Sequence, residues 1–382
     1  NIDNATLTVS TEVHGAVFGD ILEISAYDGN TLVTTTKAAV GEDVLLSFSN
    51  PKLWSPERPF LFDLTIKLMS AGTITDTVRS YFGMRKIALK KDDFGIVRMQ
   101  LNNSDYFQFG PLDQGWWPDG LYTAPTDEAL KYDIIKTKEL GFNLIRKHVK
   151  VEPARWYAHC DRLGILVWQD MPNGDEGPQW QGKKYFDGSE FKRSPKSEEI
   201  YRTEWKGIMA YLYSHPSIVS WVPFNEAWGQ FKTHEIAEWT KSYDPSRLVN
   251  AASGGNFYRT GDIVDLHNYP EPKMYLYDAE RTNVLGEYGG IGLPIKGHLW
   301  NTDNNWGYVK FKNSKETTAE YVKYAKQLKN LVKAGFSGAI YTQTTDVEGE
   351  VNGFMTYDRK VDKMNISEVR KANLEVINML QN

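Results

Sequence analysis

The sequence has 382 residues, which is long enough for two domains. Its formal net charge of −5 gives no polycationic surface and so argues against a nucleic-acid partner. No apolar run approaches the ~20 residues of a membrane span, and the single cysteine, Cys160, excludes an internal disulfide and a thiolate zinc cluster.

Aromatic residues make up 13% of the chain, and 12 of them are tryptophans. Two interpretations of this richness stay open: a large aromatic core, or a surface on which sugar rings stack. The chain begins at Asn1 without a methionine and shows no signal-like segment, so we expect a fragment or a processed form.

Residues 1–86 alternate apolar and polar side chains at the period of a β-strand. The segments ATLTVSTEV, DILEISAYD, DVLLSFS and FLFDLTIKL show this alternation, with Gly- and Asp-containing turn signals between them. About five to seven short strands at this spacing predict an all-β antiparallel sandwich. Because no catalytic constellation lies in this region, we expect a support module.

Beyond residue 86 the pattern becomes one of alternating strands and helices. Thr126 can cap a helix that Gly141 stops, and Pro153 can start a second helix that Gly164 closes. Strand patterns recur as FNLIRKH, ILVWQD, RLVNAAS, DIVDLHNYP, TNVLGEYGG and GAIYTQTTD. About eight such strands predict a parallel (β/α)₈ barrel over residues 87–382, with the domain border near Phe82–Ile87.

The stretch SIVSWVPFNEAWGQ, residues 217–230, contains a buried strand that ends at Asn225 and Glu226. Glu287 in LGEYGG occupies a matching position. We assign these glutamates to the fourth and seventh strands, whose carboxyl ends converge in a barrel. Two facing carboxyl groups are the minimum equipment for cleaving a glycosidic bond, and the pKa of one of them should rise so that it serves as the acid. The alternative is that each glutamate caps a helix or pairs with a lysine.

Several motifs together resemble glycoside hydrolase family 2, the family of β-galactosidases, β-glucuronidases and β-mannosidases. They are KLWSPERPFLFDLTIKL, YFGMRKI, GFNLIRKHVKVEPARWYAHCDRLGILVWQD, HPSIVSWVPFNEAW and VLGEYGG. The resemblance implies an immunoglobulin-like sandwich over residues 1–86 and a catalytic TIM barrel over residues 87–382. The family's N-terminal sugar-binding jelly roll has no counterpart in this chain.

The resemblance also implies roles for individual residues. Glu226 matches the acid/base, Glu287 the nucleophile of a retaining double displacement, and Asn225 the asparagine that holds the sugar's 2-hydroxyl. Arg146 matches an arginine that keeps the nucleophile ionised, and Tyr269 or Tyr288 would donate to that nucleophile. We expect the substrate to be bound by Asn225, Arg146, His148, Asp113, Trp116, Trp168, Trp228, His267, Asn268, Tyr269, Tyr288 and Gln343.

Three further features bear on these expectations. His148 stands two residues after Arg146, so both should face the same side of a strand; a buried, satisfied histidine is the alternative. The Asn-x-Lys motif that reads a uronate is absent after the last strand, which argues against a glucuronide. The loop GPLDQGWWPDGLY, with Asp113 and Trp116, is either a sugar platform or a packed cover.

We therefore predict a retaining exo-β-glycosidase, β-galactosidase-like by default. The alternatives are a β-mannosidase or other β-glycosidase acting on a plant or algal polysaccharide, and a non-catalytic carbohydrate-binding protein of the same fold. We expect an oligo- or polysaccharide partner, no cofactor, no metal, and neither a nucleic-acid nor a membrane partner. The resemblance implies a periplasmic or secreted location, and the oligomeric state stays open.

Overall fold

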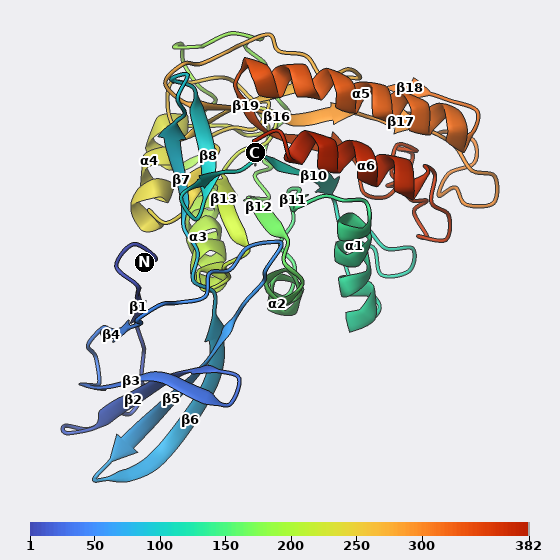
Figure 1. Cartoon of the computed structure of the whole chain (residues 1–382). Helices are drawn as coiled ribbons and strands as arrows, with labels where there is room; N and C mark the ends of the chain where they lie inside the picture. Colours follow the sequence, from blue (N-terminus) through green and yellow to red (C-terminus); the bar gives the residue numbers. More distant parts are fainter. Residues whose placement is uncertain (381–382) are drawn as a thin grey trace. The chain divides into compact units, whose positions relative to one another are not determined.

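The computed structural model describes residues 1–380, and contacts group the chain into two compact units (Figure 1). The first unit comprises Asn1–Lys86 together with Ser214–Pro216, and the second comprises Ile87–Tyr213 and the chain from Ser217 onward. None of the helices in the described part has the length and the apolar composition that crossing a bilayer requires.

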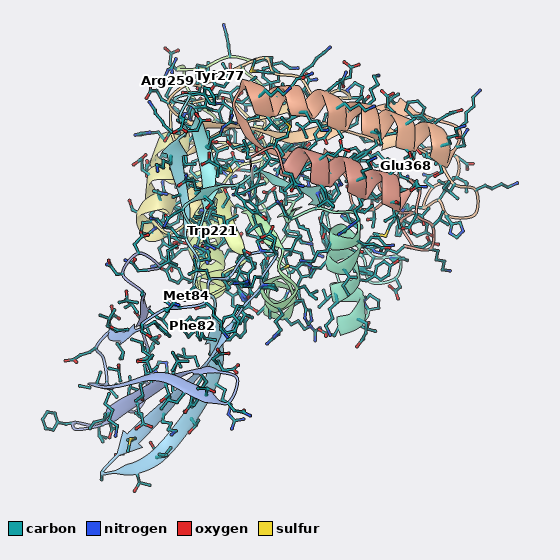
Figure 2. All side chains as sticks on the ribbon, in the orientation of Figure 1. Phe82, Met84, Trp221, Arg259, Tyr277 and Glu368 are labelled. Atoms are coloured by element: carbon teal, nitrogen blue, oxygen red, sulfur yellow. The ribbon has the colours of Figure 1, made fainter. Side chains whose placement is uncertain are left out.

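The first unit is built entirely from β-strands. Its strands are β1 (Thr6–Val9), β2 (Ile21–Asp28), β3 (Thr31–Ala39), β4 (Val44–Ser47), β5 (Phe62–Ser70) and β6 (Thr73–Phe82). One antiparallel sheet has the order β3-β2-β5-β6, and β1 pairs with β4. Strand β4 buries Val44 and Leu46 and exposes the residues between and after them, as the period-two pattern predicts. Phe82 and Met84, labelled in Figure 2, belong to the core that results. The predicted sandwich is confirmed.

The second unit begins with an antiparallel sheet of β7 (Ile87–Lys91), β8 (Val97–Leu101) and β9 (Ser104–Asp105). Strand β8 is buried along its whole length. The Nη1 of Arg98 donates to the carbonyl oxygens of Val332 at 3.1 Å and Phe336 at 2.8 Å. This sheet is thereby attached to the junction that leads into the last barrel strand.

The barrel is a parallel eight-stranded sheet with the order β14-β13-β12-β11-β10-β19-β16-β15. Its strands in chain order are β10 (Gln108–Asp113), β11 (Leu144–Lys147), β12 (Leu166–Asp170), β13 (Ile218–Val222), β14 (Leu248–Val249), β15 (Ile263–Asn268), β16 (Thr282–Gly289) and β19 (Phe336–Thr342). The last strand pairs with the first, so the predicted barrel is confirmed. Among the described residues no ladder joins β14 to β15, and we call this gap in the pairing the seam.

Within residues 1–380, six helices follow strands of the barrel. They are α1 (Asp127–Glu139), α2 (Ala154–Leu163), α3 (Pro195–Leu212), α4 (Thr233–Tyr243), α5 (Ser314–Ala334) and α6 (Ile366–Ile377). The hydroxyl of Thr126 accepts from the amide of Ala129, and Gly164 closes α2 in the left-handed conformation, both as predicted. Figure 1 shows α5 and α6 lying side by side.

Two strand connections depart from the ideal (β/α)₈ pattern. In the part of the chain that the structure describes, no helix lies between β14 and β15 or between β15 and β16. The corresponding segments, SGGNFYRTGD and YPEPKMYLYD, contain the Gly and Pro residues that interrupt helices. A short excursion after β16 carries β17 (Ile291–Gly292) and β18 (Val309–Lys310), which pair in parallel.

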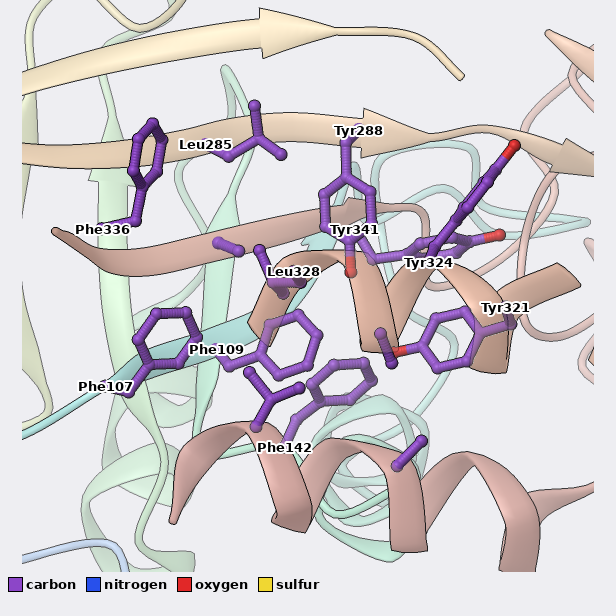
Figure 3. Close-up of a cluster of buried hydrophobic side chains, with 14 of the residues drawn as sticks. Phe107, Phe109, Phe142, Leu285, Tyr288, Tyr321, Tyr324, Leu328, Phe336 and Tyr341 are labelled. Carbon is purple, nitrogen blue, oxygen red and sulfur yellow. The ribbon is translucent and has the colours of Figure 1, made fainter. Parts of the chain in front are cut away.

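The barrel strands are buried on both faces. Every residue of β13 is buried, and Trp221, labelled in Figure 2, is fully enclosed. Figure 3 shows an apolar cluster that contains Phe109, Leu285, Leu328 and Tyr341, contributed by β10, β16, α5 and β19. This packing fixes the strands whose carboxyl ends carry the residues described next.

Candidate active site

Glu226 and Glu287 lie at the carboxyl ends of the fourth and seventh barrel strands. Glu226 follows β13 in a sharp turn with φ of 50°, and its amide donates to the carbonyl of Ser253 at 2.9 Å. Glu287 stands on β16. The Glu226 side chain is 30% exposed and the Glu287 side chain only 6%. A carboxylate oxygen of each glutamate lies within 4.8 Å of the other.

Arg146 on β11 organises the floor of the site. Its fully buried guanidinium donates from Nη1 to Glu287 Oε1 at 3.2 Å and to the Gly286 carbonyl at 3.1 Å. Its Nη2 donates to Asn225 Oδ1 at 2.7 Å and to Asp170 Oδ2 at 2.9 Å. A cation in this position favours the ionised form of Glu287 and fixes the amide of Asn225.

Tyr269 provides a second donor to Glu287. Its hydroxyl donates to Glu287 Oε2 at 2.7 Å and lies 2.6 Å from Thr342 Oγ1. Its ring stacks on that of Tyr308, with centroids 3.7 Å apart and planes 3° from parallel. Both oxygens of Glu287 are therefore held by a protein donor, one by Arg146 and one by Tyr269.

Two histidines border the same carboxylates. Nδ1 of His267, on β15, lies 3.0 Å from Glu226 Oε1 and 3.4 Å from Glu287 Oε2. Nε2 of His148 lies 3.7 Å from Glu287 Oε1, so this side chain reaches the same carboxylate as Arg146. The ring of His267 thus stands between the two glutamates, whereas His148 touches one of them.

The charges around the two carboxylates favour a proton away from Glu226. The raised pKa therefore belongs to Glu287 and not, as predicted from the sequence, to the glutamate assigned as the acid, because His267 lowers the pKa of Glu226. Burial raises the pKa of Glu287 to about 7 and Glu226 adds to the shift, while His267 and Arg146 oppose it. Burial would also raise the pKa of Glu226, but the hydrogen bond and charge of His267 lower it. The pKa of His267 is raised because the two carboxylates outweigh its burial. Burial and Arg146 lower the pKa of His148 to about 3, which keeps it neutral.

The structure brings together seven of the predicted site residues around this centre: Glu226, Glu287, Asn225, Arg146, His148, His267 and Tyr269. Asn268 lies at the border, where its Oδ1 accepts from Lys183 Nζ at 3.3 Å. Gln343 follows β19 and donates to Glu350 Oε2 at 2.6 Å. Trp228 is 44% exposed beyond Glu226.

Two predicted residues do not reach the site. Tyr288 follows Glu287 directly on β16 and therefore points to the opposite face, where it packs edge-on against Tyr341 in the apolar cluster (Figure 3). Of the two tyrosines considered as donors to the nucleophile, Tyr269 makes that contact. Trp168 is fully buried inside the barrel, and its indole N–H donates to Gln108, which leaves it no surface for a sugar.

The loop after β10 is packed. Asp113 is buried against Lys147 at 2.8 Å and accepts from the Gly115 amide. The ring of Trp116 packs on that of Tyr122, with centroids 4.8 Å apart. Of the two interpretations of this loop, these contacts favour the packed cover, and Asp113 and Trp116 are not among the residues that meet Glu226 and Glu287.

Sequence reasoning missed three residues beside the site. Tyr308 and Trp306 lie on the excursion after β16, are 46% and 44% exposed, and have ring centroids 5.3 Å apart. The amide of Trp306 donates to the carbonyl of Gly349, which fixes this segment next to Glu350. The segment has no strand or helix period, so the only available signal was its aromatic content.

The group formed by Glu226, His267 and Glu287 is the one cluster among the described residues with the spacing of metal ligands. The guanidinium of Arg146 contacts Glu287 and lies 3.5 Å from Nε2 of His267. A fixed cation at this distance repels a metal ion, so we interpret the gap between these side chains as a place for a proton.

Two sequence profiles match the chain. Residues 3–85 match Glycosyl hydrolases family 2, and residues 123–288 match Glycosyl hydrolases family 2, TIM barrel domain. A putative β-glucuronidase of Formosa agariphila is 26% identical over 78% of this chain and 27% of its own length. A β-galactosidase of Lactococcus lactis is 28% identical over 64% of this chain and 23% of its own length.

The fold comparison agrees with the profiles. The structure of a β-D-glucuronidase from Dictyoglomus thermophilum aligns with a TM-score of 0.75 and 18% identity, over 97% of this chain and 66% of that one. The chain spans about a quarter of the length of the curated relatives it matches. The two profiles cover the sandwich and most of the barrel, and the strands they cover carry Arg146, Glu226 and Glu287. This chain belongs to glycoside hydrolase family 2.

Proposed function

We propose that this chain carries the catalytic centre of a retaining β-glycosidase. The observation that carries the proposal is the pair of carboxylates, Glu226 and Glu287, with oxygens within 4.8 Å of each other. Retaining enzymes hold their carboxyl groups about 5–5.5 Å apart, whereas inverting enzymes leave roughly 6.5–9.5 Å for a water molecule.

The surroundings of the two glutamates support a division of roles. Glu287 receives donors from Arg146 and Tyr269, which oppose the rise that burial causes in its pKa and so suit a nucleophile that must be ionised. Glu226 is more exposed, which suits a group that exchanges protons with a leaving oxygen and then with water. Glu287 attacks the anomeric carbon while Glu226 protonates the leaving oxygen; Glu226 then activates the water that releases the sugar from Glu287.

The charges beside the site support a neutral sugar, and we keep a β-galactoside as the default. Burial raises the pKa of Glu350 to about 7 against the hydrogen bond from Gln343, and Glu226 adds to the shift. Glu350 is thus a third carboxyl group next to the reacting pair. The guanidinium of Arg146 is already engaged by Asp170 and Glu287, so it offers little to a uronate.

A β-glucuronide is the second candidate, because one observation favours it. The Lys183 ammonium donates to Asn268 Oδ1 and lies 4.5 Å from the centroid of the Tyr275 ring, at the border of the site. An ammonium beside an amide is a suitable receptor for a sugar carboxylate. The names of the relatives include both β-glucuronidase and β-galactosidase, so they support either candidate.

Covalent trapping tests the reaction and the sugar together. The protein is incubated with 2-deoxy-2-fluoro β-glycosyl fluorides of galactose, glucose, mannose and glucuronic acid, and its intact mass is measured. We expect a mass gain that Glu287→Gln abolishes. Lys183→Gln serves as the matched variant: it should slow labelling by the glucuronyl reagent alone if that reagent reacts. If no reagent adds mass to the protein, the binding-protein alternative takes precedence.

We further propose that residues 1–86 act as a support module for a catalytic domain of residues 87–382. The absence of the site residues from the first unit supports this division. A periplasmic or secreted location, as the family resemblance implies, would suit a polysaccharide substrate. Fractionation of the native host with an antibody to the protein tests the location.

A further inference from the structure

The imidazole of His267 is held on every side in a position between the two carboxylates. Its Nδ1 faces Glu226 and Glu287, and its Nε2 lies 2.8 Å from the hydroxyl of Ser253. A Cβ on Gly254 would lie 2.1 Å from the ring, so only glycine allows the backbone to pass there. The ring therefore has one orientation, with one nitrogen toward the carboxylates and one toward Ser253.

This arrangement suits either protonation state of the ring. An imidazolium donates from Nδ1 to Glu226 and from Nε2 to the Ser253 oxygen. A neutral ring that keeps its Nε2 proton still donates to Ser253, while its Nδ1 accepts from a protonated Glu226. No side chain has to rotate between these two states, because the proton moves along one hydrogen bond of 3.0 Å.

Several charged groups face the ring from the elements around it. Negative charges are contributed by Glu226 after β13, Glu287 on β16 and Asp265 on β15 itself. The opposing charge is Arg146 on β11, whose Nη1 is 3.5 Å from Nε2 of His267. The neighbouring His148 stays neutral. Asp170 on β12 is paired with Arg146, so these two charges offset each other. The three remaining carboxylates favour a positive charge on His267.

We propose that His267 and Glu226 share one proton, and that this pair, and not Glu226 alone, forms the acid of the site. His267 is a positioning residue in this scheme, since it acts through Glu226 and not on the sugar. The inference rests on the proposed function for the role of Glu226 as the proton donor to the leaving oxygen.

The proton balance of the scheme is closed. Before the reaction the imidazolium faces the Glu226 carboxylate. Transfer from Nδ1 to Oε1 gives neutral His267 and protonated Glu226, which hands the proton to the leaving oxygen as the glycosidic C–O bond breaks. When water releases the sugar from Glu287, its proton goes to Glu226 and returns to His267. The net reaction consumes one water molecule, and no proton is gained or lost by the protein.

Histidine ¹⁵N NMR tests the sharing without any substrate. The intact protein and its Glu226→Gln variant are titrated, and the His267 signals are assigned with His267→Asn. We expect His267 to titrate above its ordinary value near 6.5, and to titrate at lower pH in Glu226→Gln. His234 on α4, which contacts Thr260 and neither of the two glutamates, is the internal reference and should give the same signals in both proteins. A His267 titration that is unchanged in Glu226→Gln overturns the proposal.

The dependence of kcat/KM on the leaving group then distinguishes a loss of the shared proton from a loss of packing around His267. His267→Asn keeps a donor at the position of Nδ1 but cannot hold the extra proton. On the glycosides that the trapping experiment selects, we expect the alkaline limb of kcat/KM to move to lower pH. The variant should lose about 10-fold to 100-fold in kcat/KM when the leaving group is methanol or a sugar. The loss in kcat/KM should be small when the leaving group is 2,4-dinitrophenolate, which needs no acid. An equal loss for both leaving groups indicates packing alone and contradicts the proposal.

A second variant protects the test against misfolding. Ser253→Ala removes the oxygen that accepts from Nε2 and leaves Glu226 in place, so it should also lower the pH at which His267 titrates. If the His267 titration changes in Glu226→Gln but no fluoro-sugar labels the protein, the glycosidase proposal fails and the proposal of a shared proton stands. If labelling occurs without coupling, only the shared proton fails.

Discussion

Arg146 and Lys147 are neighbours on β11, and each carries a buried charge into a different cluster. Arg146 points to the face where Asp170, Glu287 and Asn225 meet. Lys147 points the other way, to Asp113 at 2.8 Å and Glu152 at 3.0 Å, with the Trp156 ring beneath its ammonium. Strand β11 therefore supplies one cation to the site and a second cation to the packing between the strand and a helix.

The two clusters differ in the balance between their cations and their carboxylates. Around Lys147 the neighbouring Lys150 also pairs with Glu152, so two ammonium groups face two carboxylates. Around Arg146 the carboxylates of Asp170, Glu287 and Glu226 outnumber the fixed cation, and a proton on His267 reduces the excess negative charge. A closed charge balance is typical of structure, and an excess of one charge that a proton reduces is typical of chemistry.

The largest effect should come from Glu287→Gln, which removes the nucleophile from the open cluster. We expect kcat/KM to fall by about 10⁴-fold or more. The same substitution should increase the free energy of unfolding at high pH, although it lowers activity. The reason is that the pKa of Glu287 in the folded protein is about 7, above its unfolded value. Wild type therefore loses stability as pH rises from about 4.5 to about 7, and the variant does not. Steady-state kinetics and urea unfolding at pH 4.5 and 8 measure the two effects; a variant that is inactive because it is unfolded would contradict this.

Lys147→Met should break the closed cluster by leaving Asp113 and Glu152 buried with one ammonium fewer. We expect a loss of roughly 3–5 kcal/mol in the free energy of unfolding, with little change in kcat/KM of the folded fraction. Adding Asp113→Asn and Glu152→Gln to the same protein should recover most of the loss. If the triple variant is no more stable than the single one, packing of the lysine and not its charge holds this region.

Tyr269→Phe should produce a smaller, pH-dependent effect. The hydrogen bond from Tyr269 favours the ionised form of Glu287, so its removal raises the pKa of that group. The acid limb of kcat/KM, expected near pH 7 because Glu287 must be ionised, should move to higher pH. At neutral pH we expect a loss of about 10²-fold. A pH–rate profile measures both, and an acid limb that stays in place would show that Tyr269 does not tune the nucleophile.

Tyr288→Phe is the matched control and should have the smallest effect. Tyr288 follows Glu287 in sequence, but it lies in the apolar cluster, where its hydroxyl is buried beside Tyr321 and away from the two glutamates. We expect kcat/KM within about twofold of wild type and a change in unfolding free energy within about 0.5 kcal/mol. A loss of activity like that of Tyr269→Phe would mean that the two faces of β16 are less separate than their contacts indicate.

The strands that carry the two glutamates were predictable because each glutamate comes directly after an apolar strand pattern, at the end of the strand that lies at the barrel mouth. The sequence placed Glu226 and Glu287 on the fourth and seventh strands, and the sheet order has them there. The inward or outward direction of a side chain was harder to predict. Strands buried on both faces show no alternation, so nothing marked Trp168 as enclosed or Asp113 as facing Lys147.

The sequence spacing of residues on one strand nevertheless indicates which side chains point to the same face. Glu287 and Tyr288 are adjacent on a strand and cannot face the same side, so Tyr288 could have been excluded. Arg146 and His148 are two apart, and both reach Glu287. Residues such as Tyr308 and Glu350 come from irregular segments fixed by tertiary contacts, for which local periodicity holds no information.

The seam between β14 and β15 gives the site a mechanical property. Glu226 is tied to Ser253 after β14, while His267 stands on β15, so the contacts that hold the shared proton cross the part of the barrel without ladder pairing. The Ser253–His267 bond measures 2.8 Å, and spreading the seam by about 1 Å would break it. Backbone hydrogen bonds from Asp262 to Val249 and from Gly254 to Asp265 also cross the seam and keep these two segments together. If His267 and Glu226 share a proton, a separation of the two strands changes the acidity of Glu226.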